Sequence, residues 1–379
     1  MRSVWVAADN IVSPLGFSSE ENFAAILNGE TALKETHSKY IEFPVWTASF
    51  NENQLSQIKN VCQGIVTTKF ESLLYFSISK TLEKGQVKPK SDRTIFVFAT
   101  TKGNIELIGN KQINPKELNL FHSAQKIVNI FGNPNKPIVV SNACISGGTA
   151  ILVAKDLLEA GTYDEAIVCG ADTLNDFVLS GFNSLKALSP NQCKPFDADR
   201  IGINLGEAAA TVVLKVSDSM ANNPNQIRIA GGSVTNDANH ISGPSRTGLE
   251  LALAIQQGLK QANLRANQID YVSAHGTATS YNDEMEAKAI NHAGLSNVLT
   301  NSLKGYFGHT LGAAGLLECI IVMHSMMQNV VIKSRGFDKL GTTVPVNICT
   351  QNISKEIKNS IKTLAGFGGC NAALILSKQ

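Results

Sequence analysis

Short apolar runs alternate with longer segments of helical periodicity along most of the chain. The apolar runs are rich in β-branched residues, and several are continuously hydrophobic, which is typical of strands covered on both faces. Alternating strands and helices predict an α/β protein built around a sheet. The expected strands are residues 95–100, 137–143, 165–171, 211–216, 227–233, 269–274, 298–302, 361–364 and 372–377.

Expected helices lie between these strands, at residues 146–160, 248–262 and 312–328. Gly161 follows the first of them, which is a common signal for the end of a helix. In each half of the chain a strand leads through a glycine-rich turn into a helix, and further strands end the half. This layout predicts an internal duplication, with one half at residues 1–218 and the other at 226–379. The polar, proline-containing segment 220–226 is the expected junction.

The composition argues against several classes of protein. The chain has 379 residues, of which 43% are hydrophobic and 17% are charged, and its formal net charge is +2. Disordered chains combine low hydrophobicity with high net charge, and proteins that mainly bind nucleic acid carry a basic excess, so we expect neither. The length predicts two or three folding units, or one large α/β unit.

Signals for membrane insertion and secretion are not found. The most apolar stretch, residues 313–327, is interrupted by Glu318, Cys319 and His324 and is too short for a bilayer, so no membrane span is predicted. The first residues, MRSVWVAADN, do not resemble a signal peptide. The seven cysteines are an odd number without a C-x-x-C pair, which indicates a reducing compartment rather than disulfides or a zinc site. We therefore expect a cytoplasmic protein without a bound metal.

The first candidate for chemistry is Cys144, which lies within Ser-Asn-Ala-Cys-Ile-Ser-Gly-Gly at residues 141–148. At this point an expected strand turns into an expected helix. A helix N-terminus stabilises a thiolate through its dipole and free N–H groups, so we predict a lowered pKa for this thiol. For a lone cysteine, a buried packing corner would be the better interpretation.

Further glycine-rich turns carry other candidate groups. His275 follows the strand at 269–274, where side chains point into a cleft at the strand ends, although a structural histidine is an equally good interpretation. Lys304 and His309 lie in the turn before the helix at 312–328, and an exposed loop lysine is the usual alternative. Phe367 lies in Gly-Phe-Gly-Gly, for which a tight hairpin would be the commoner explanation. One cysteine, two histidines and a glycine-rich source of N–H groups together indicate acyl transfer through a thioester.

Neither a P-loop nor a G-x-G-x-x-G fingerprint is present, which argues against nucleotide chemistry. Instead, an ordered set of motifs resembles the β-ketoacyl-acyl carrier protein synthases, above all the elongating condensing enzymes of fatty acid and polyketide synthesis. The resemblance covers nearly the whole chain, and it implies a thiolase-like fold with a duplicated five-layered αβαβα core. The motifs are Asn142-Ala143-Cys144, Lys194-Pro195-Phe196-Asp197-Ala198-Asp199-Arg200, Gly206-Glu207-Ala208, His275-Gly276-Thr277, Lys304 with Gly308-His309, and Gly366-Phe367-Gly368-Gly369.

The resemblance also implies the catalytic groups. Cys144 matches the nucleophile of the family, and His275 and His309 match its two catalytic histidines. Lys304 matches a lysine that orients one histidine and tunes its charge, and Glu318 is the expected partner of this lysine. The two-histidine pattern resembles the elongating branch of the family.

The remaining site residues are expected to bind substrate or to support the site. The backbone N–H groups of Cys144 and Phe367 would hold an oxyanion, and Phe367 would act as a gate between the two half-reactions. Thr277, Thr279 and Ser242 are the expected substrate contacts. Cys370 is interpreted as a filler at a position that is usually Thr, and the acidic residues expected to be structural are Asp283 and Glu286.

A protein with these features would be a 3-oxoacyl-acyl carrier protein synthase. Cys144 would take an acyl group from the phosphopantetheine arm of an acyl carrier protein, and a decarboxylative Claisen condensation with malonyl-acyl carrier protein would follow. No tightly bound cofactor is implied, and a homodimer or a heterodimer with a related subunit is expected. The alternative is a non-catalytic partner subunit of the chain-length-factor type, but such partners lose the nucleophile. A thiolase acting on coenzyme A esters is disfavoured by the two-histidine pattern.

Overall fold

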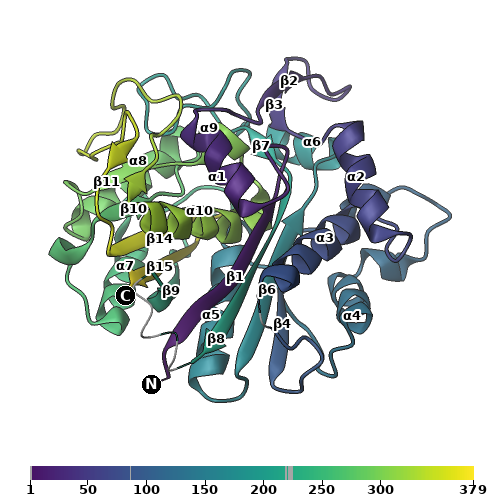
Figure 1. The fold of residues 1–379 in the computed structure, drawn as a ribbon. Helices are drawn as coiled ribbons and strands as arrows, with labels where there is room; N and C mark the ends of the chain where they lie inside the picture. The colour runs from purple at the N-terminus through teal and green to yellow at the C-terminus, as the bar shows by residue number, and fades with distance from the viewer. Residues whose placement is uncertain (1, 86, 218–219, 221–224) are drawn as a thin grey trace.

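The computed structural model describes residues 2–85, 87–217, 220 and 225–379. A ten-stranded mixed sheet runs through the molecule (Figure 1). Its strands are β1 (Val4–Val12), β4 (Thr94–Ala99), β5 (Ile138–Val140), β6 (Glu165–Asp172), β8 (Ala208–Val216), β9 (Ile227–Asn236), β10 (Tyr271–Ser273), β11 (Leu299–Asn301), β14 (Asn359–Gly366) and β15 (Cys370–Lys378). Their order in the sheet is β11-β10-β14-β15-β9-β1-β8-β6-β4-β5.

The two halves of this sheet have the same pairing pattern. In the first half, β4 pairs in parallel with β5 and β6, and the antiparallel strands β8 and β1 follow. In the second half, β10 pairs in parallel with β11 and β14, and the antiparallel strands β15 and β9 follow. The halves join where Trp5 of β1 pairs with Arg228 of β9. This repeat supports the expected duplication; the division into 1–218 and 226–379 stays a prediction, and most of the junction 220–226 lies outside the described residues.

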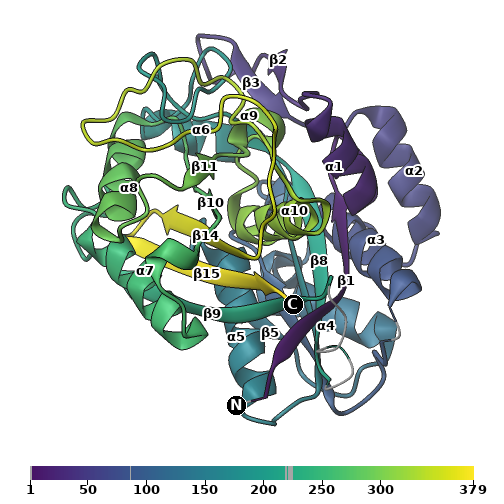
Figure 2. The ribbon, with the colours of Figure 1, turned by 60° about the vertical axis from the view of Figure 1, so that its left-hand side comes forward.

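Helices cover both faces of each half-sheet and complete five layers. Between the half-sheets lie α5 (Ser146–Glu159) and α10 (Ala314–Gln328), which contact apolar side chains of both. Outside the first half-sheet lie α3 (Lys69–Lys84) and α4 (Leu120–Phe131), with α2 (Glu52–Cys62) next to them. Outside the second lie α7 (Leu249–Ala262) and α8 (Ser280–His292), on the opposite side from α2 and α3 in Figure 2. The αβαβα layering is therefore as predicted.

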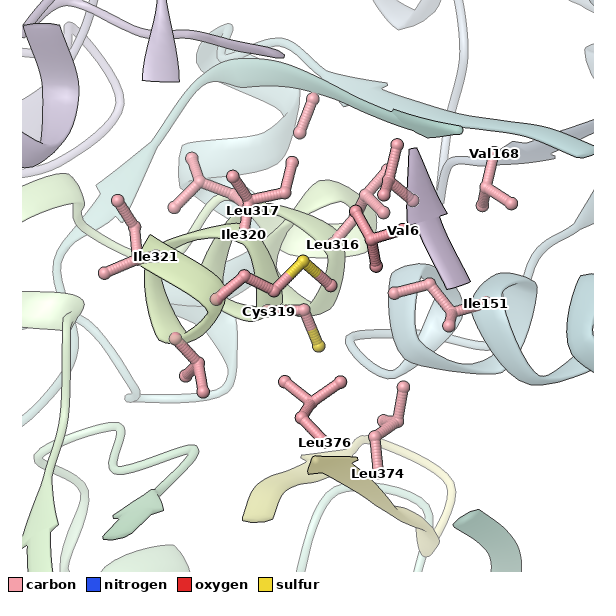
Figure 3. Close-up of a cluster of buried hydrophobic side chains, with 14 of the residues drawn as sticks. Val6, Ile151, Val168, Leu316, Leu317, Cys319, Ile320, Ile321, Leu374 and Leu376 are labelled. Atoms are coloured by element: carbon pink, nitrogen blue, oxygen red, sulfur yellow. The ribbon is translucent and has the colours of Figure 1, made fainter. Parts of the chain in front are cut away.

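Alternating side chains along each strand supply the apolar contacts between layers. In β6, Ala166 and Val168 face the central helices, whereas Ile167 and Cys169 face the outer ones. Figure 3 shows the central cluster, in which α10 contributes Leu316 and Ile320. Burial of each such leucine or isoleucine stabilises the fold by about 1.5–3 kcal/mol. The cluster also includes Val6, Ile151, Leu317, Cys319, Ile321, Leu374 and Leu376.

The two central helices approach each other through glycine. A Cβ atom on Gly147 would lie 2.5 Å from the backbone nitrogen of Leu316, and one on Gly315 would lie 2.7 Å from the backbone nitrogen of Gly148. Any side chain at these positions would separate α5 from α10. The close contact holds together the N-terminal ends of the two helices, which follow the turns that carry Cys144 and His309.

The stretch 313–327 is part of a helical segment whose length the sequence analysis underestimated. The segment Leu311–Gln328 is long and apolar enough to cross a membrane by length and composition alone, and 89% of it is buried inside the fold. The length argument against a span was therefore wrong. The segment is apolar because it forms a layer of the protein core.

Smaller elements complete the described part of the chain. A three-stranded sheet contains β2 (Lys34–Thr36), β3 (Val45–Ala48) and β7 (Leu205–Gly206). The strands β12 (Val330–Val331) and β13 (Ile353–Ser354) form a pair. The short helices are α1 (Ser19–Leu27), α6 (Asp176–Ser184) and α9 (Lys304–Phe307), and the 3-10 turns are η1 (Ile105–Leu107), η2 (Pro115–Leu118), η4 (Ala266–Gln268) and η5 (Leu311–Ala313).

Candidate active site

Cys144 lies in the turn between β5 and α5, as expected. Ala143 before it has a φ angle of 44°, in the left-handed region that non-glycine residues seldom adopt. The Ser146 hydroxyl donates a hydrogen bond to the Ala143 carbonyl oxygen at 2.6 Å and accepts one from the Asn142 N–H group at 2.8 Å. These bonds fix the turn, and the buried Cys144 side chain lines a cavity of about 400 Å³.

The predicted lowering of the Cys144 pKa is wrong for the free protein. Burial raises the pKa of this thiol to about 11. The positive charges of Lys102 and Lys304 and the backbone N–H group of Phe367 act in the opposite direction but do not outweigh burial. The Cys144 thiol of the free protein is therefore neutral at pH 7. Lys102, in the turn after β4, was not predicted as a site residue.

His275 follows strand β10, with only Ala274 between them. A buried carboxylate on α8 holds the turn, because Glu286 accepts hydrogen bonds from the N–H groups of His275 and Gly276, both at 2.7 Å. Asp283, one helical turn earlier, accepts the N–H group of Thr277 at 2.9 Å. Within this turn, the two acidic residues accept hydrogen bonds from backbone N–H groups only. This agrees with the structural role expected for them.

His309 follows α9 and is held by the first half of the chain. Its N–H group donates to the Asn204 carbonyl oxygen at 2.7 Å, and its carbonyl oxygen accepts the Gly206 N–H group at 2.9 Å. The His275 and His309 rings are 5.1 Å apart between centroids and nearly perpendicular, at 85°. Both side chains line the same cavity as Cys144. The fold thus brings together three side chains from turns far apart in the sequence.

Both imidazoles are neutral at pH 7 in this setting. Burial holds the pKa values of His275 and His309 well below the usual range, and the charge of Lys304 adds to the effect in both cases. Among the described residues, Nδ1 of His275 and both ring nitrogens of His309 have no hydrogen-bond partner. Buried polar atoms of this kind are available to a ligand, since leaving them unpaired costs free energy.

A closed ionic cluster lies behind the histidines. Lys304 Nζ contacts Glu318 Oε1, as expected, and both side chains are buried. Lys362 Nζ approaches the other oxygen, Oε2, at 2.6 Å and is fully buried. The sequence analysis did not identify Lys362, although a lysine in the middle of the apolar strand at 361–364 was a visible signal.

The loop Gly366-Phe367-Gly368-Gly369 is a tight turn between β14 and β15 and also lines the cavity. The hairpin interpretation is therefore confirmed, and the role of Phe367 as a gate and N–H donor stays a prediction. A Cβ atom on Gly366 would lie 3.1 Å from the Cys144 backbone nitrogen and 2.8 Å from Cys370 Sγ, so glycine lets this strand end approach Cys144 closely. The Phe367 ring lies 5.7 Å from that of Phe182 on α6.

The expected substrate contacts also line the cavity. Thr277 and Thr279 share a hydrogen bond of 2.8 Å between their hydroxyl groups, and Ser242 lies on the loop that follows β9. Of the predicted site residues, only Lys304 and Glu318 do not line this cavity within the described part of the chain. Ile201 and Tyr281 line it as well and were not predicted.

A buried thiol, two neutral imidazoles and a glycine-rich turn in one cavity of this layered fold define a condensing enzyme of the thiolase-like class. The family models agree, because the beta-ketoacyl synthase N-terminal domain matches residues 1–219 and the beta-ketoacyl synthase C-terminal domain matches residues 227–338. The chain belongs to the beta-ketoacyl synthase family.

Individual relatives match over their whole length. The 3-oxoacyl-acyl-carrier-protein synthase 2 of Vibrio harveyi is 30% identical, with 100% of this chain and 99% of the relative covered. The ketosynthase ApeO in complex with its chain length factor ApeC from Xenorhabdus doucetiae has a TM-score of 0.86 at 24% identity, covering 100% of this chain and 98% of that one. The ishigamide ketosynthase/chain length factor has a TM-score of 0.89 at 21% identity, with 100% and 99% covered. The two structures share the fold of this chain.

Proposed function

We propose that this chain is a catalytically active 3-oxoacyl-acyl carrier protein synthase with Cys144 as its nucleophile. The observation that carries the proposal is the convergence of Cys144, His275 and His309 on one cavity. The Vibrio harveyi relative has this activity in its name. A partner subunit without catalytic function would need none of these side chains at the cavity.

The first half-reaction would move an acyl group from the phosphopantetheine thioester of a carrier protein to Cys144. Because this thiol is protonated at neutral pH, its proton must leave as the sulfur attacks the thioester carbonyl. A neutral imidazole in the same cavity can accept that proton and then return it to the departing pantetheine sulfur. The backbone N–H groups of Cys144 and Phe367 would hold the oxyanion.

In the second half-reaction, malonyl-carrier protein would enter the same cavity. His275 and His309 would donate hydrogen bonds to its thioester carbonyl oxygen while the bond to the carboxylate breaks and carbon dioxide leaves. The resulting enolate carbon attacks the acyl carbonyl on Cys144, and the carbon–sulfur bond to the enzyme breaks. The product is a 3-oxoacyl thioester that is two carbons longer. Lys304, held by Glu318, would orient the histidine pair.

The carrier arm would enter along the polar side of the cavity. Thr277, Thr279 and Ser242 line it and offer hydroxyl groups to the amides of phosphopantetheine. Phe367 would act as the gate, because its ring borders both the cavity and Phe182. Phosphopantetheine would therefore act as the carrier of the substrate, and we propose no tightly bound cofactor.

The proposed partners are an acyl carrier protein and a second ketosynthase-type subunit. The end strand β5 has one edge without a partner in the described structure and presents three half-buried apolar residues, Ile138–Val140. Such an edge can pair with a strand of another subunit. Such an edge could serve a homodimer or a heterodimer. The heterodimer stays an alternative because two similar structures contain a ketosynthase with its chain length factor. The seven cysteines are unpaired, which is consistent with the expected cytoplasmic location.

Intact mass spectrometry tests the proposal. The purified protein would be exposed to a panel of acyl-carrier thioesters and then to malonyl-carrier protein. We expect an acyl adduct that disappears when malonyl-carrier protein is added, together with a 3-oxoacyl-carrier product. Cys144→Ala should abolish the adduct, and Cys349→Ala, which removes another buried thiol, should not.

The opposite result has a definite meaning. If no donor acylates the protein alone, the active homodimer is excluded, and the chain requires or is a partner subunit. If Cys144→Ala still forms 3-oxoacyl product, the proposed nucleophile is wrong.

A further inference from the structure

Lys362 is a buried cation that the proposed reaction does not use. It lies in the middle of β14 and is fully buried. Its ammonium group donates hydrogen bonds to the carbonyl oxygens of Ala274 at 2.8 Å and Ser273 at 3.2 Å, and it forms the ion pair with Glu318 at 2.6 Å. The ammonium group thus has two backbone hydrogen bonds and one ion pair.

Two of these contacts are with the residues that lead directly into His275. In the parallel pairing of β14 with β10, Lys362 is opposite Ser273. Its ammonium group therefore fixes the carboxyl end of β10 from behind, while Glu286 fixes the turn through the His275 N–H group. The third contact ties the same point to Glu318 on α10.

The cluster has an unusual charge balance. One carboxylate, Glu318, faces two ammonium groups, Lys304 on one oxygen and Lys362 on the other. Burial acts to raise the Glu318 pKa, but the two lysines outweigh it and lower that pKa. Burial also lowers the pKa of Lys362, and Glu318 opposes this effect. Charges in the interior are costly, and a methionine would fill a similar volume without that cost.

We propose that Lys362 is a positioning residue of the condensation site, which ties the end of β10 that carries His275 to Glu318 and completes a two-lysine cluster behind the histidine pair. This inference rests on the proposed roles of His275 and His309. The second cation disfavours protonation of the imidazoles, so the ring that accepts the Cys144 proton during acyl transfer stays neutral in mildly acidic conditions.

The other charged and titratable groups around the histidines define the electrostatic background. Burial is the largest influence on both pKa values, and the positive charge of Lys304 is the next largest. Lys362 lowers the pKa of both histidines, His309 also lowers that of His275, and Lys102 also lowers that of His309. Glu318 on α10, Glu286 on α8 and the Cys144 thiol complete the set. Since Cys144 responds to Lys102 and Lys304, removal of Lys362 should affect the histidines selectively.

The test compares Lys362→Gln and Lys362→Met with the wild type and with Lys155→Met. Glutamine keeps hydrogen-bond donors without the charge, and Lys155 is another buried lysine, paired with Glu159 at 2.7 Å on α5. The rates of malonyl-carrier decarboxylation and of acyl transfer to Cys144 would be measured from pH 5 to 9.

Removal of one cation raises the histidine pKa values, so the acid limb of the acyl-transfer profile should move to higher pH. At an effective dielectric constant of about 20, a unit charge about 12 Å away changes a pKa by about one unit, and a closer charge changes it by more. We therefore expect this limb to shift by at least about one pH unit in both Lys362 variants and not in Lys155→Met, with decarboxylation by Lys362→Gln changed less than about threefold. An acid limb at the wild-type position, or an equal loss of both half-reactions at every pH, would overturn the proposal.

A measurement that needs no activity separates this proposal from the proposed function. In isotope-labelled protein, NMR titration should show that the His275 and His309 rings titrate well below their usual range, and Lys362→Gln should move their titration upward by at least about one unit. If the wild type is inactive but this shift is seen, the proposed reaction fails and the positioning effect of Lys362 stands. If the titration is the same in both proteins, the inference is wrong. The inference is also wrong if the two histidine rings of the wild-type protein titrate near pH 6.5.

Discussion

Gly206→Ala should damage condensation through a backbone contact far from Cys144. Gly206 ends the short strand β7, and its N–H group donates to the His309 carbonyl oxygen at 2.9 Å. A Cβ atom at this position would lie 2.0 Å from the Phe307 carbonyl oxygen and 3.2 Å from the Ala48 Cβ atom. The Phe307 oxygen is backbone and cannot rotate away, so the segment that carries His309 must move.

The size of the movement follows from the contact distance. A carbon–oxygen contact of about 3.3 Å is the ordinary close limit, so β7 and the Phe307 carbonyl must separate by roughly 1.3 Å. Overpacking of this kind destabilises a protein by about 1–3 kcal/mol. Misplacement of a catalytic group by about 1 Å lowers a rate by about a hundredfold. We therefore expect decarboxylation of malonyl-carrier protein to fall about a hundredfold.

The assay follows both half-reactions and the folded state. Acyl transfer to Cys144 should fall less than tenfold, because the turn of this residue is held by Ser146 and not by β7. The matched control is Gly181→Ala on α6, where a new Cβ atom meets nothing within 4 Å and should even favour the helix slightly. The reasoning is refuted if Gly206→Ala decarboxylates within twofold of Gly181→Ala while both remain folded.

Two further predictions concern burial. Because burial raises the Cys144 pKa to about 11, its alkylation by iodoacetamide should accelerate about tenfold per pH unit from pH 7 to 10. Intact mass spectrometry would follow the alkylation, and a rate that stops rising below pH 9 would contradict this prediction. In Glu286→Gln, an amide –NH2 group would face one of the N–H groups now bound at His275 and Gly276, so urea unfolding should show a loss of about 3 kcal/mol. An unchanged unfolding midpoint would contradict the second prediction.

The strongest secondary-structure predictions came from continuous apolar runs. The expected strand at 165–171 is β6 to within one residue, because residues 166–171 are apolar or small and buried on both faces of the sheet. The expected strands at 269–274 and 298–302 are shorter at both ends in the structure, as Tyr271–Ser273 and Leu299–Asn301. Strand β1 was missed, because Asp9 and Asn10 interrupt its apolar pattern; Asp9 pairs with His324 on α10 at 3.0 Å.

Sequence alone was sufficient to identify the candidate chemistry of this protein. Cys144, His275, His309 and Phe367 could be selected because each lies in a glycine-rich turn at the end of a strand, and such turns converge at one edge of an α/β sheet. The order of the motifs also indicated the family, which the family models confirm.

Only the tertiary structure decided the protonation states and the supporting contacts. The Cys144 thiol is protonated rather than ionised, because burial outweighs the charges of Lys102 and Lys304. Lys362 joins the site only because β14 and α10 bring it to Glu318. The local sequence pattern indicates which residues end a strand. Desolvation and Coulomb interactions depend on neighbours that are distant in the chain and meet only in the folded state.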